Sequence, residues 1–440
     1  MAGRHPLREE QIKLIILICF HIIGCCISLA FIARIYPEFF IFFRPAELPG
    51  VIAIIAAFAI VSTLFTFAQF SIGYFIGFYS YTMALGYLWL NYFSEFNYNH
   101  RLAGLSAAAS AVAFLFPALF VGSPVRQIWS LTPTAFDRLL NLILMAAAAI
   151  VAVGASYNFR LVGIEDIYTF REALTSPTAL NYLTGITSVA LLPFAFACFV
   201  ERKYFWRAGT VLVLLLLFYP VTLSKLALFT PVFLVGMVVL SRIFEARITV
   251  ILSLFAPMVV GLILFVLFRA EIIPYKTAIP YFGLVNFRML AIPSLAMDYY
   301  NDFFARHDLT YFCQIRLLKP FVPCPYQEQL GIVIYNAFGI GGNFNASLFA
   351  TEGVASVGPI FAPVAAFACG LVIALANRLS AGLPARFILV SGAILPQTFL
   401  NIPFTTVLLS QGAAILFLLW YLVPRSVIDQ SQGTRPALSD

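Results

Sequence analysis

Charged side chains are scarce in this sequence. Asp, Glu, Lys and Arg together make up 10% of its 440 residues, whereas hydrophobic residues make up 62%. A soluble globular domain carries about 25% charged residues, so this composition excludes that class. With a mean hydropathy of +0.95, the chain is predicted to be a polytopic membrane protein. The 16% of aromatic residues suits lipid-facing surfaces and interfacial belts, and much of the net charge of +7 reflects topology rather than nucleic-acid binding.

Several motifs of site chemistry are also missing. The four histidines, His5, His21, His100 and His307, are scattered without metal-ligand spacing. No Asp-x-Asp lies in the expected external loop, so a metal-held pyrophosphate would lack its usual ligands. No Gly-x-Ser-x-Gly or Ser-x-x-Lys pattern indicates a covalent nucleophile, and "GIGG" (339–342) is not followed by the Lys-Ser/Thr of a phosphate loop. These absences predict a site without metal or cofactor.

Apolar runs of about 20 residues, the length that spans a bilayer, recur along the chain. They predict an all-α fold of about twelve transmembrane helices, near 12–33, 50–69, 72–93, 104–121, 138–156, 181–200, 208–223, 226–241, 250–268, 355–376, 386–401 and 404–423. No cleavable signal peptide is apparent, and no internal repeat is visible. We expect a single polytopic transmembrane domain over 1–423 and a disordered cytoplasmic tail over 424–440.

Lys and Arg are distributed unevenly between the two predicted sides of the membrane. With the N-terminus in the cytoplasm, fourteen lie inside: Arg4, Arg8, Lys13, Arg126, Arg138, Arg202, Lys203, Arg207, Arg242, Arg247, Arg378, Arg386, Arg425 and Arg435. Six lie in short outside loops: Arg34, Arg44, Arg101, Arg160, Arg171 and Lys225. The bias predicts that both termini are cytoplasmic and that 269–330 is a large external loop, followed by a polar approach over 331–354.

The expected external loop carries an amphipathic stretch, "NFRMLAIPSLAMDYYNDFF" (286–304), in which Arg288 and Asp298 stand among apolar and aromatic residues. Such a stretch would lie along the membrane surface, with its charges solvated, or line a cavity. Arg316 and Lys319 follow in the same loop, and Lys225 lies between two apolar helices on the same predicted side.

Cations on the outer face run against the topological bias, so we expect an anionic partner there. A lipid-linked phosphate or pyrophosphate fits, because guanidinium groups match phosphate oxygens. For Lys225 alone, a side chain that snorkels to the interface is an equally good interpretation.

Two of the seven cysteines, Cys313 and Cys324, lie in the expected external loop. An oxidising compartment permits a disulfide between them, which would close the segment that presents Arg316 and Lys319. The other five fall within apolar helices, where cysteine behaves as a small hydrophobic residue.

The row of helices, the late external loop and a glycine- and asparagine-bearing approach to the next helix resemble bacterial oligosaccharide repeat-unit polymerases, the Wzy-type O-antigen and capsule polymerases. The residues that carry the resemblance are "LSK" (223–225), "NFRMLAIPSLAMDYYNDFF" (286–304) and "NFNASLFATEGVASVG" (343–358). The resemblance implies a metal-independent glycosyltransferase of the bacterial inner membrane. It would polymerise undecaprenyl-pyrophosphate-linked oligosaccharides at the periplasmic face, and a chain-length-determining polysaccharide co-polymerase is an expected partner.

On this interpretation Glu352, where the polar approach becomes a membrane helix, is the leading candidate for the general base. Asp298 and His307 are the alternative bases, and a helix-capping carboxylate is the non-catalytic alternative for Glu352. The residues expected to bind substrate are Arg288, first for the carrier pyrophosphate, with Lys225, Arg316, Lys319, Asn343, Asn345 and Tyr299. Three other functions remain open: the related O-antigen ligase, a lipid-linked oligosaccharide flippase or other transporter, and a non-enzymatic scaffold.

Overall fold

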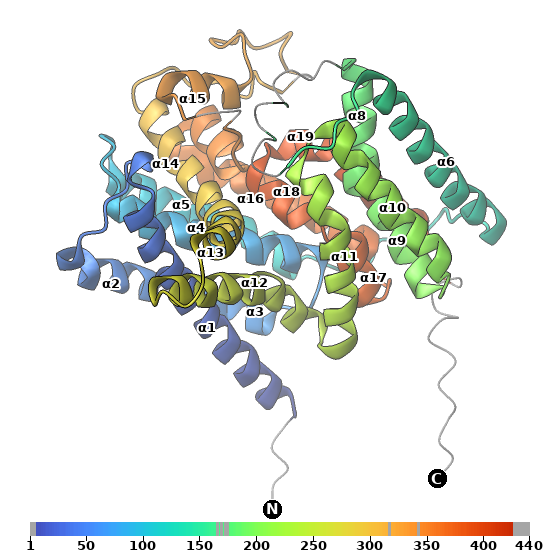
Figure 1. Cartoon of the computed structure of the whole chain (residues 1–440), viewed down its shortest axis with the longest axis horizontal. Helices are drawn as coiled ribbons and strands as arrows, with labels where there is room; N and C mark the ends of the chain where they lie inside the picture. Colours follow the sequence, from blue (N-terminus) through green and yellow to red (C-terminus); the bar gives the residue numbers. More distant parts are fainter. Residues whose placement is uncertain are drawn as a thin grey trace, which may run out of the picture. The chain divides into compact units, whose positions relative to one another are not determined.

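The computed structural model describes residues 6–163, 167, 170, 176–315, 318–340 and 344–425, with side chains from residue 9 onward (Figure 1). This part of the chain is helical and contains no strand; an isolated bridge joins Ile41 to Ser94. The predicted all-α class is therefore confirmed. The predicted tail lies outside the described residues except for its first two positions.

The chain forms two compact units, each built from separate stretches: Met1–Val121, Arg247–Ala374 and Pro396–Phe404 in the first, and Gly122–Ala246, Leu375–Leu395 and Thr405–Asp440 in the second. The first unit contains α1 (Pro6–Ile35), η1 (Pro37–Phe39), η2 (Pro45–Glu47), α2 (Leu48–Ala59), η3 (Ile60–Ser62), α3 (Thr63–Phe67), α4 (Ile72–Phe93), α5 (His100–Phe120), α12 (Ala246–Arg269), α13 (Tyr275–Phe282), η5 (Gly283–Ala291), α14 (Ile292–Phe304), α15 (Leu330–Phe338), η6 (Phe349–Ala355) and most of α16 (Ser356–Ser380) and α18 (Leu395–Asn401). The second contains α6 (Pro133–Tyr157), α8 (Thr178–Ile186), η4 (Thr187–Leu191), α9 (Leu192–Glu201), α10 (Phe205–Thr222), α11 (Lys225–Ile243), α17 (Ala385–Ser391), α19 (Phe404–Leu409) and α20 (Ala413–Leu422).

Ten helical stretches in the described residues are long and apolar enough to cross a membrane, which is typical of a polytopic membrane protein. Nine coincide with predicted spans: Glu9–Ile35, Pro45–Phe67, His100–Phe120, Pro133–Tyr157, Thr178–Glu201, Phe205–Thr222, Lys225–Ile243, Ala246–Arg269 and Phe349–Ser380. The tenth, Tyr275–Phe304, lies inside the expected external loop.

Three of the twelve predicted spans differ from these long apolar helices. The run at 72–93 is a continuous helix, α4, but its many tyrosines and glycines make it less apolar than the ten. The run at 386–401 is divided between α17, which ends at Ser391 before Gly392, and α18. The run at 404–423 is divided between α19 and α20, where Gly412 adopts a φ of 79°, a left-handed conformation that glycine reaches without steric cost.

Helix α4 is the core of the first unit. Of its 22 residues, all but Tyr92 are buried, and it packs against α2, α5 and α14 (Figure 1). A methyl group at Gly86 would lie 2.5 Å from the Ser294 hydroxyl of α14. Small residues of this kind let membrane helices approach closely, so α4 and α14 form one tightly packed pair.

Three π-helical segments interrupt the helices: η4, η5 and η6. Such segments are rare and frequently lie at functional sites. Two of them are in the first unit and carry predicted site residues, Arg288 in η5 and Glu352 in η6.

The expected external loop 269–330 begins with α13, η5 and α14, and the described residues between α14 and α15 form no further helix. In α14, twelve of thirteen residues are buried. The part of the stretch 286–304 that forms α14 therefore differs from the solvated surface helix that the amphipathic pattern allowed, because Ser294, Asp298, Asn301 and Asp302 are buried in the first unit.

Candidate functional site

The structure assigns the predicted site residues to different places. Seven belong to the first unit: Asp298, Tyr299, Arg288, His307, Lys319, Asn345 and Glu352. Lys225 begins α11 in the second unit and is half-buried there. Arg316 and Asn343 lie outside the described residues. A site can therefore be built from the residues of the first unit.

Asp298 and Asp302 lie one turn apart on α14, beneath the chain that joins α4 to α5. The Ser94 hydroxyl donates a hydrogen bond to Oδ2 of Asp298 at 2.7 Å, and the Tyr98 hydroxyl contacts Oδ1 of the same carboxyl. The backbone N–H of Asn97 donates to Oδ1 of Asp302 at 3.2 Å. Both carboxyl groups are buried, so together they fasten the 94–98 loop to α14.

The Asp298 carboxyl belongs to a hydrogen-bonded cluster whose other residues were not predicted from the sequence. The Tyr98 hydroxyl lies 2.8 Å from Oδ1 of Asn91 and 3.2 Å from the Tyr87 hydroxyl. His100 Nδ1 lies 2.8 Å from the same Asn91 oxygen. Burial, together with the charge of Asp298, raises the pKa of Tyr98 well above its usual value, so this phenol keeps its proton at neutral pH.

One stretch of the sequence is related to this cluster. The run "NYFSEFNYNH" (91–100) is rich in polar side chains and lies between two apolar helices, but such a composition is also typical of an ordinary turn. Its contacts to Asp298 join positions 200 and 204 residues apart, and no local pattern encodes such a pairing.

Glu352 lies in η6 with only 6% of its surface exposed. The Thr351 hydroxyl contacts its Oε2. Tyr300, on α14 packed against η6, and Ser347, one turn before, both bury hydroxyl oxygens that lack a hydrogen-bond partner among the described residues. Glu352 is therefore a membrane carboxylate in partly unsatisfied polar surroundings, a feature that commonly marks function.

The helix that follows Glu352 is broken at Gly358, whose φ is 76° and ψ 168°. The carbonyl oxygens just before the break accept hydrogen bonds from outside the helix: the N–H of Thr310 donates to Ala355 at 2.8 Å, and that of Tyr311 to Ser356 at 3.1 Å. These bonds satisfy carbonyls that an unbroken helix would satisfy itself.

Cys313, two residues further along the same segment, is in a disulfide with Cys324, with their Cα atoms 5.2 Å apart. The segment between them includes Lys319, whose side chain is exposed. The cation-bearing segment is thus joined through Thr310 and Tyr311 to the broken helix that carries Glu352.

Arg288 and His307 are both exposed to solvent. Arg288 lies in η5, directly before α14 in the chain. The His307 ring stacks on Phe303 with centroids 3.9 Å apart, and its Nδ1 lies 2.8 Å from the Phe303 carbonyl oxygen.

Tyr299 is fully buried in an aromatic cluster, with its ring centroid 4.8 Å from Phe96, 4.9 Å from Phe338 and 5.1 Å from Phe344. Asn345 follows Phe344 and is half-buried. Contact between Tyr299 and a substrate, which the sequence predicts, would require this cluster to open, whereas Asn345 lies at its edge.

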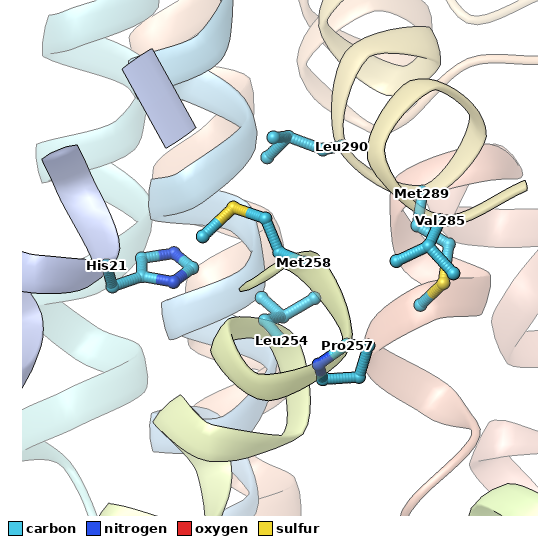
Figure 2. A pocket seen from close by; sticks show the side chains of 7 residues that line it. All are labelled: His21, Leu254, Pro257, Met258, Val285, Met289 and Leu290. Carbon is cyan, nitrogen blue, oxygen red and sulfur yellow. The ribbon is translucent and has the colours of Figure 1, made fainter. Parts of the chain in front are cut away.

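One small cavity in the first unit is shown in Figure 2. It is lined by His21, Leu254, Pro257, Met258, Val285, Met289 and Leu290. His21 Nε2 lies 3.0 Å from the Thr82 hydroxyl. The volume of about 10 Å³ is room for about one water molecule, so this cavity does not hold a sugar.

The arrangement offers acid–base chemistry from carboxyl groups and anion binding from exposed cations. Among the described residues, no group of three or more His, Cys, Asp or Glu side chains is placed to hold a metal ion.

Nothing matches this chain among protein-family models, curated proteins or solved structures.

Proposed function

We propose that the chain is a glycosyltransferase of the all-helical membrane class. It polymerises undecaprenyl-pyrophosphate-linked oligosaccharide repeat units into a surface polysaccharide, at the periplasmic face of the bacterial inner membrane. One observation carries the proposal. Buried Glu352 precedes a break in a long apolar helix, and the carbonyl groups just before that break accept hydrogen bonds from Thr310 and Tyr311, which directly precede the disulfide-closed segment that bears Lys319. Irregular backbone within a membrane span is tolerated where it is buried in protein or lines a cavity.

In the proposed reaction, a sugar hydroxyl of one carrier-linked chain attacks the anomeric carbon of another. The bond between that carbon and the pyrophosphate oxygen breaks, and Glu352 takes the proton of the attacking hydroxyl. Arg288 and Lys319 stabilise the departing pyrophosphate, with Arg316 as a further cation. Asn345 and Asn343 hydrogen-bond to the sugars.

Deletion of the gene followed by electrophoresis of surface polysaccharide tests the function. A polymerase predicts a single-repeat product in the deletion strain and long chains when the wild-type protein is restored. Unchanged long chains in the deletion strain would contradict the proposal.

Substitution of Glu352 by Gln tests the proposed base. The change keeps size and hydrogen bonding but removes the proton acceptor, so we expect a loss of polymer synthesis of at least about 100-fold at normal protein level. Glu328→Gln, at an exposed carboxylate that accepts from Asn336 at 3.2 Å, is the matched control and should polymerise normally. If the Glu352→Gln protein polymerises normally, the role passes to His307 or Asp298.

Substitution of Arg288 tests pyrophosphate binding. A guanidinium binds phosphate oxygens with two parallel donors, which an ammonium group does not offer. Arg288→Lys should therefore lose most polymer, as Arg288→Ala does, whereas Arg269→Lys at the exposed end of α12 should have no effect. Normal long polysaccharide chains made by the Arg288→Ala protein would show that Arg288 does not bind the pyrophosphate.

A transporter of lipid-linked oligosaccharides is the second candidate, because broken helices are also typical of transporters. The same deletion distinguishes it: loss of all surface glycan suits a flippase, or the related ligase, rather than a polymerase. Purified protein that lengthens lipid-linked repeats in detergent would exclude both alternatives.

A further inference from the structure

The four tryptophans of the chain divide into two pairs. Trp89 and Trp420 are buried, whereas Trp129 and Trp206 are 75% and 94% exposed. Both exposed tryptophans belong to the second unit. Tryptophan is enriched where a membrane meets water, because its ring is apolar and its N–H finds a polar partner. The exposed pair therefore indicates a membrane–water boundary on this unit.

Trp129 lies in the chain between α5 and α6, which is held in place by hydrogen bonds. The N–H of Val125 donates to the Arg378 carbonyl oxygen at 3.2 Å, and the N–H of Ile128 donates to the Tyr421 hydroxyl at 2.8 Å. The side chains of Ile128 and Trp129 are nevertheless exposed. This fixed segment therefore presents apolar side chains outward.

Trp206 lies in the first turn of α10, beside the exposed aromatic residues Tyr204 and Phe205 and the exposed cations Lys203 and Arg207. The Arg207 guanidinium lies 5.7 Å from the centroid of the Tyr204 ring. Lys203 has a φ of 60°, a left-handed conformation that glycine adopts at lower cost. The shape of the turn therefore does not account for a lysine at this position.

An ion pair brings the two exposed tryptophans to one end of the second unit. Arg202, at the end of α9, pairs with Asp137 in α6. Trp206 follows Arg202 by four residues, and Trp129 precedes Asp137 by eight. Helices α9 and α10 pack against each other and against α6 (Figure 1).

This end of the second unit, which the positive-inside bias predicts to be cytoplasmic, carries an excess of positive charge. Its described residues include nine cations and three carboxylates. The cations are Arg126, Arg138, Arg202, Lys203, Arg207, Arg242, Arg378, Arg386 and Arg425, and the carboxylates are Asp137, Glu201 and Glu245. Two of the carboxylates are already paired, Asp137 with Arg202 and Glu201 with Arg386 at 3.6 Å. Lys203 and Arg207 are therefore available to an anion from outside the chain.

We propose that this end of the second unit binds the head groups of anionic phospholipids. Lys203 and Arg207 contact the lipid phosphates, and Trp206 and Trp129 lie in the boundary between head groups and acyl chains. Exposed apolar side chains beside cations match a bilayer surface, where phosphate groups lie directly above acyl chains. The inference does not depend on the proposed glycosyl transfer, and its test has no activity readout.

Quenching of Trp206 fluorescence by brominated lipids tests the proposal. The full-length Trp129→Phe protein is reconstituted in phosphatidylcholine bilayers that contain either brominated phosphatidylglycerol or brominated phosphatidylcholine. The Trp206 signal is the difference from the protein that also carries Trp206→Phe. A basic residue near the surface enriches anionic lipid about fivefold, so half-quenching should need about tenfold less brominated phosphatidylglycerol than brominated phosphatidylcholine.

Two pairs of substitutions in the Trp129→Phe protein test the cations. Lys203→Gln combined with Arg207→Gln should remove the preference for the anionic lipid. Arg269→Gln combined with Lys276→Gln removes the same charge from exposed positions of the first unit and should leave the preference unchanged.

Three results would overturn the proposal. Equal quenching by the two brominated lipids would show that the anionic head group is not selected. No quenching by either lipid would place Trp206 outside the bilayer and favour an acidic protein segment as the partner. A preference that survives the substitution of Lys203 and Arg207, at a normal protein level, would show that these cations do not bind the lipid.

Discussion

Helices α14 and α6 differ in which of their side chains are buried: α14 buries polar residues, whereas α6 leaves most of its apolar residues exposed. In α14, twelve of thirteen residues are buried, and four of these are the polar residues Ser294, Asp298, Asn301 and Asp302. In α6, only six of 25 residues are buried, at 136, 140, 143, 147, 151 and 154, which is a single stripe at helical spacing. Its exposed side chains include Leu142, Met145 and Val153.

The difference follows from the solvent. Lipid is as apolar as leucine, so an apolar side chain gains little by moving from lipid into the protein, and α6 leaves most of its apolar residues outside. Polar groups lose their water in lipid and must find partners inside the protein. The polar residues of α14 have such partners in α4 and in the 94–98 loop, which is why the polar helix is the buried one.

The largest expected effect concerns whether α14 crosses the membrane as α6 does. Alkaline phosphatase fused after Gln314 should be active and after Arg207 inactive, because the positive-inside bias places these positions on opposite sides. A fusion after Ile272 should also be active if Tyr275–Phe304 enters and leaves on one side. Opposite activities at Ile272 and Gln314, at equal protein levels, would show that this stretch is a full span.

The next effect concerns the lipid face of α6. Leu142 is 57% exposed near the middle of the helix, and an arginine at the centre of a membrane helix costs about 3 kcal/mol on insertion scales. Leu142→Arg should therefore lower the amount of inserted protein strongly, whereas Leu142→Ala should lower it little. Equal insertion of the two variants would mean that this face of α6 is not in lipid.

The smallest expected effect is on stability, and it distinguishes a glycine at a contact between two helices from a glycine outside such a contact. A methyl group at Gly370 would lie 2.5 Å from the Phe114 carbonyl oxygen, whereas one at Gly236 meets nothing within 4 Å. Gly370→Ala should destabilise the protein by about 1–3 kcal/mol through overpacking, and Gly236→Ala should stabilise α11 by up to about 1 kcal/mol. Thermal unfolding in detergent measures both. A Gly370→Ala protein as stable as the wild type would show that α5 and α16 are not in such close contact.

Local features of the site followed from the sequence. Cys313 and Cys324 lie near each other in one non-apolar segment, and their pairing needs only a short closed loop. Glu352 was expected at the entrance of a membrane helix and lies there, in η6. The break at Gly358 and the π-helical form of η5 and η6 were not expected. The carbonyl groups before the break accept hydrogen bonds from Thr310 and Tyr311, and no local pattern encodes such a pairing.

The sequence by itself determined that the chain is helical and rich in membrane spans, because burial in lipid is a property of each apolar run and needs no partner. It also determined where most of those runs begin and end. Only the tertiary structure decided which polar residues work together: Asp298 with Tyr98 and His100, and Thr310 with Ala355. A polar group deprived of water must pair with whatever the fold brings beside it, and across 200 residues of chain no local pattern specifies that neighbour.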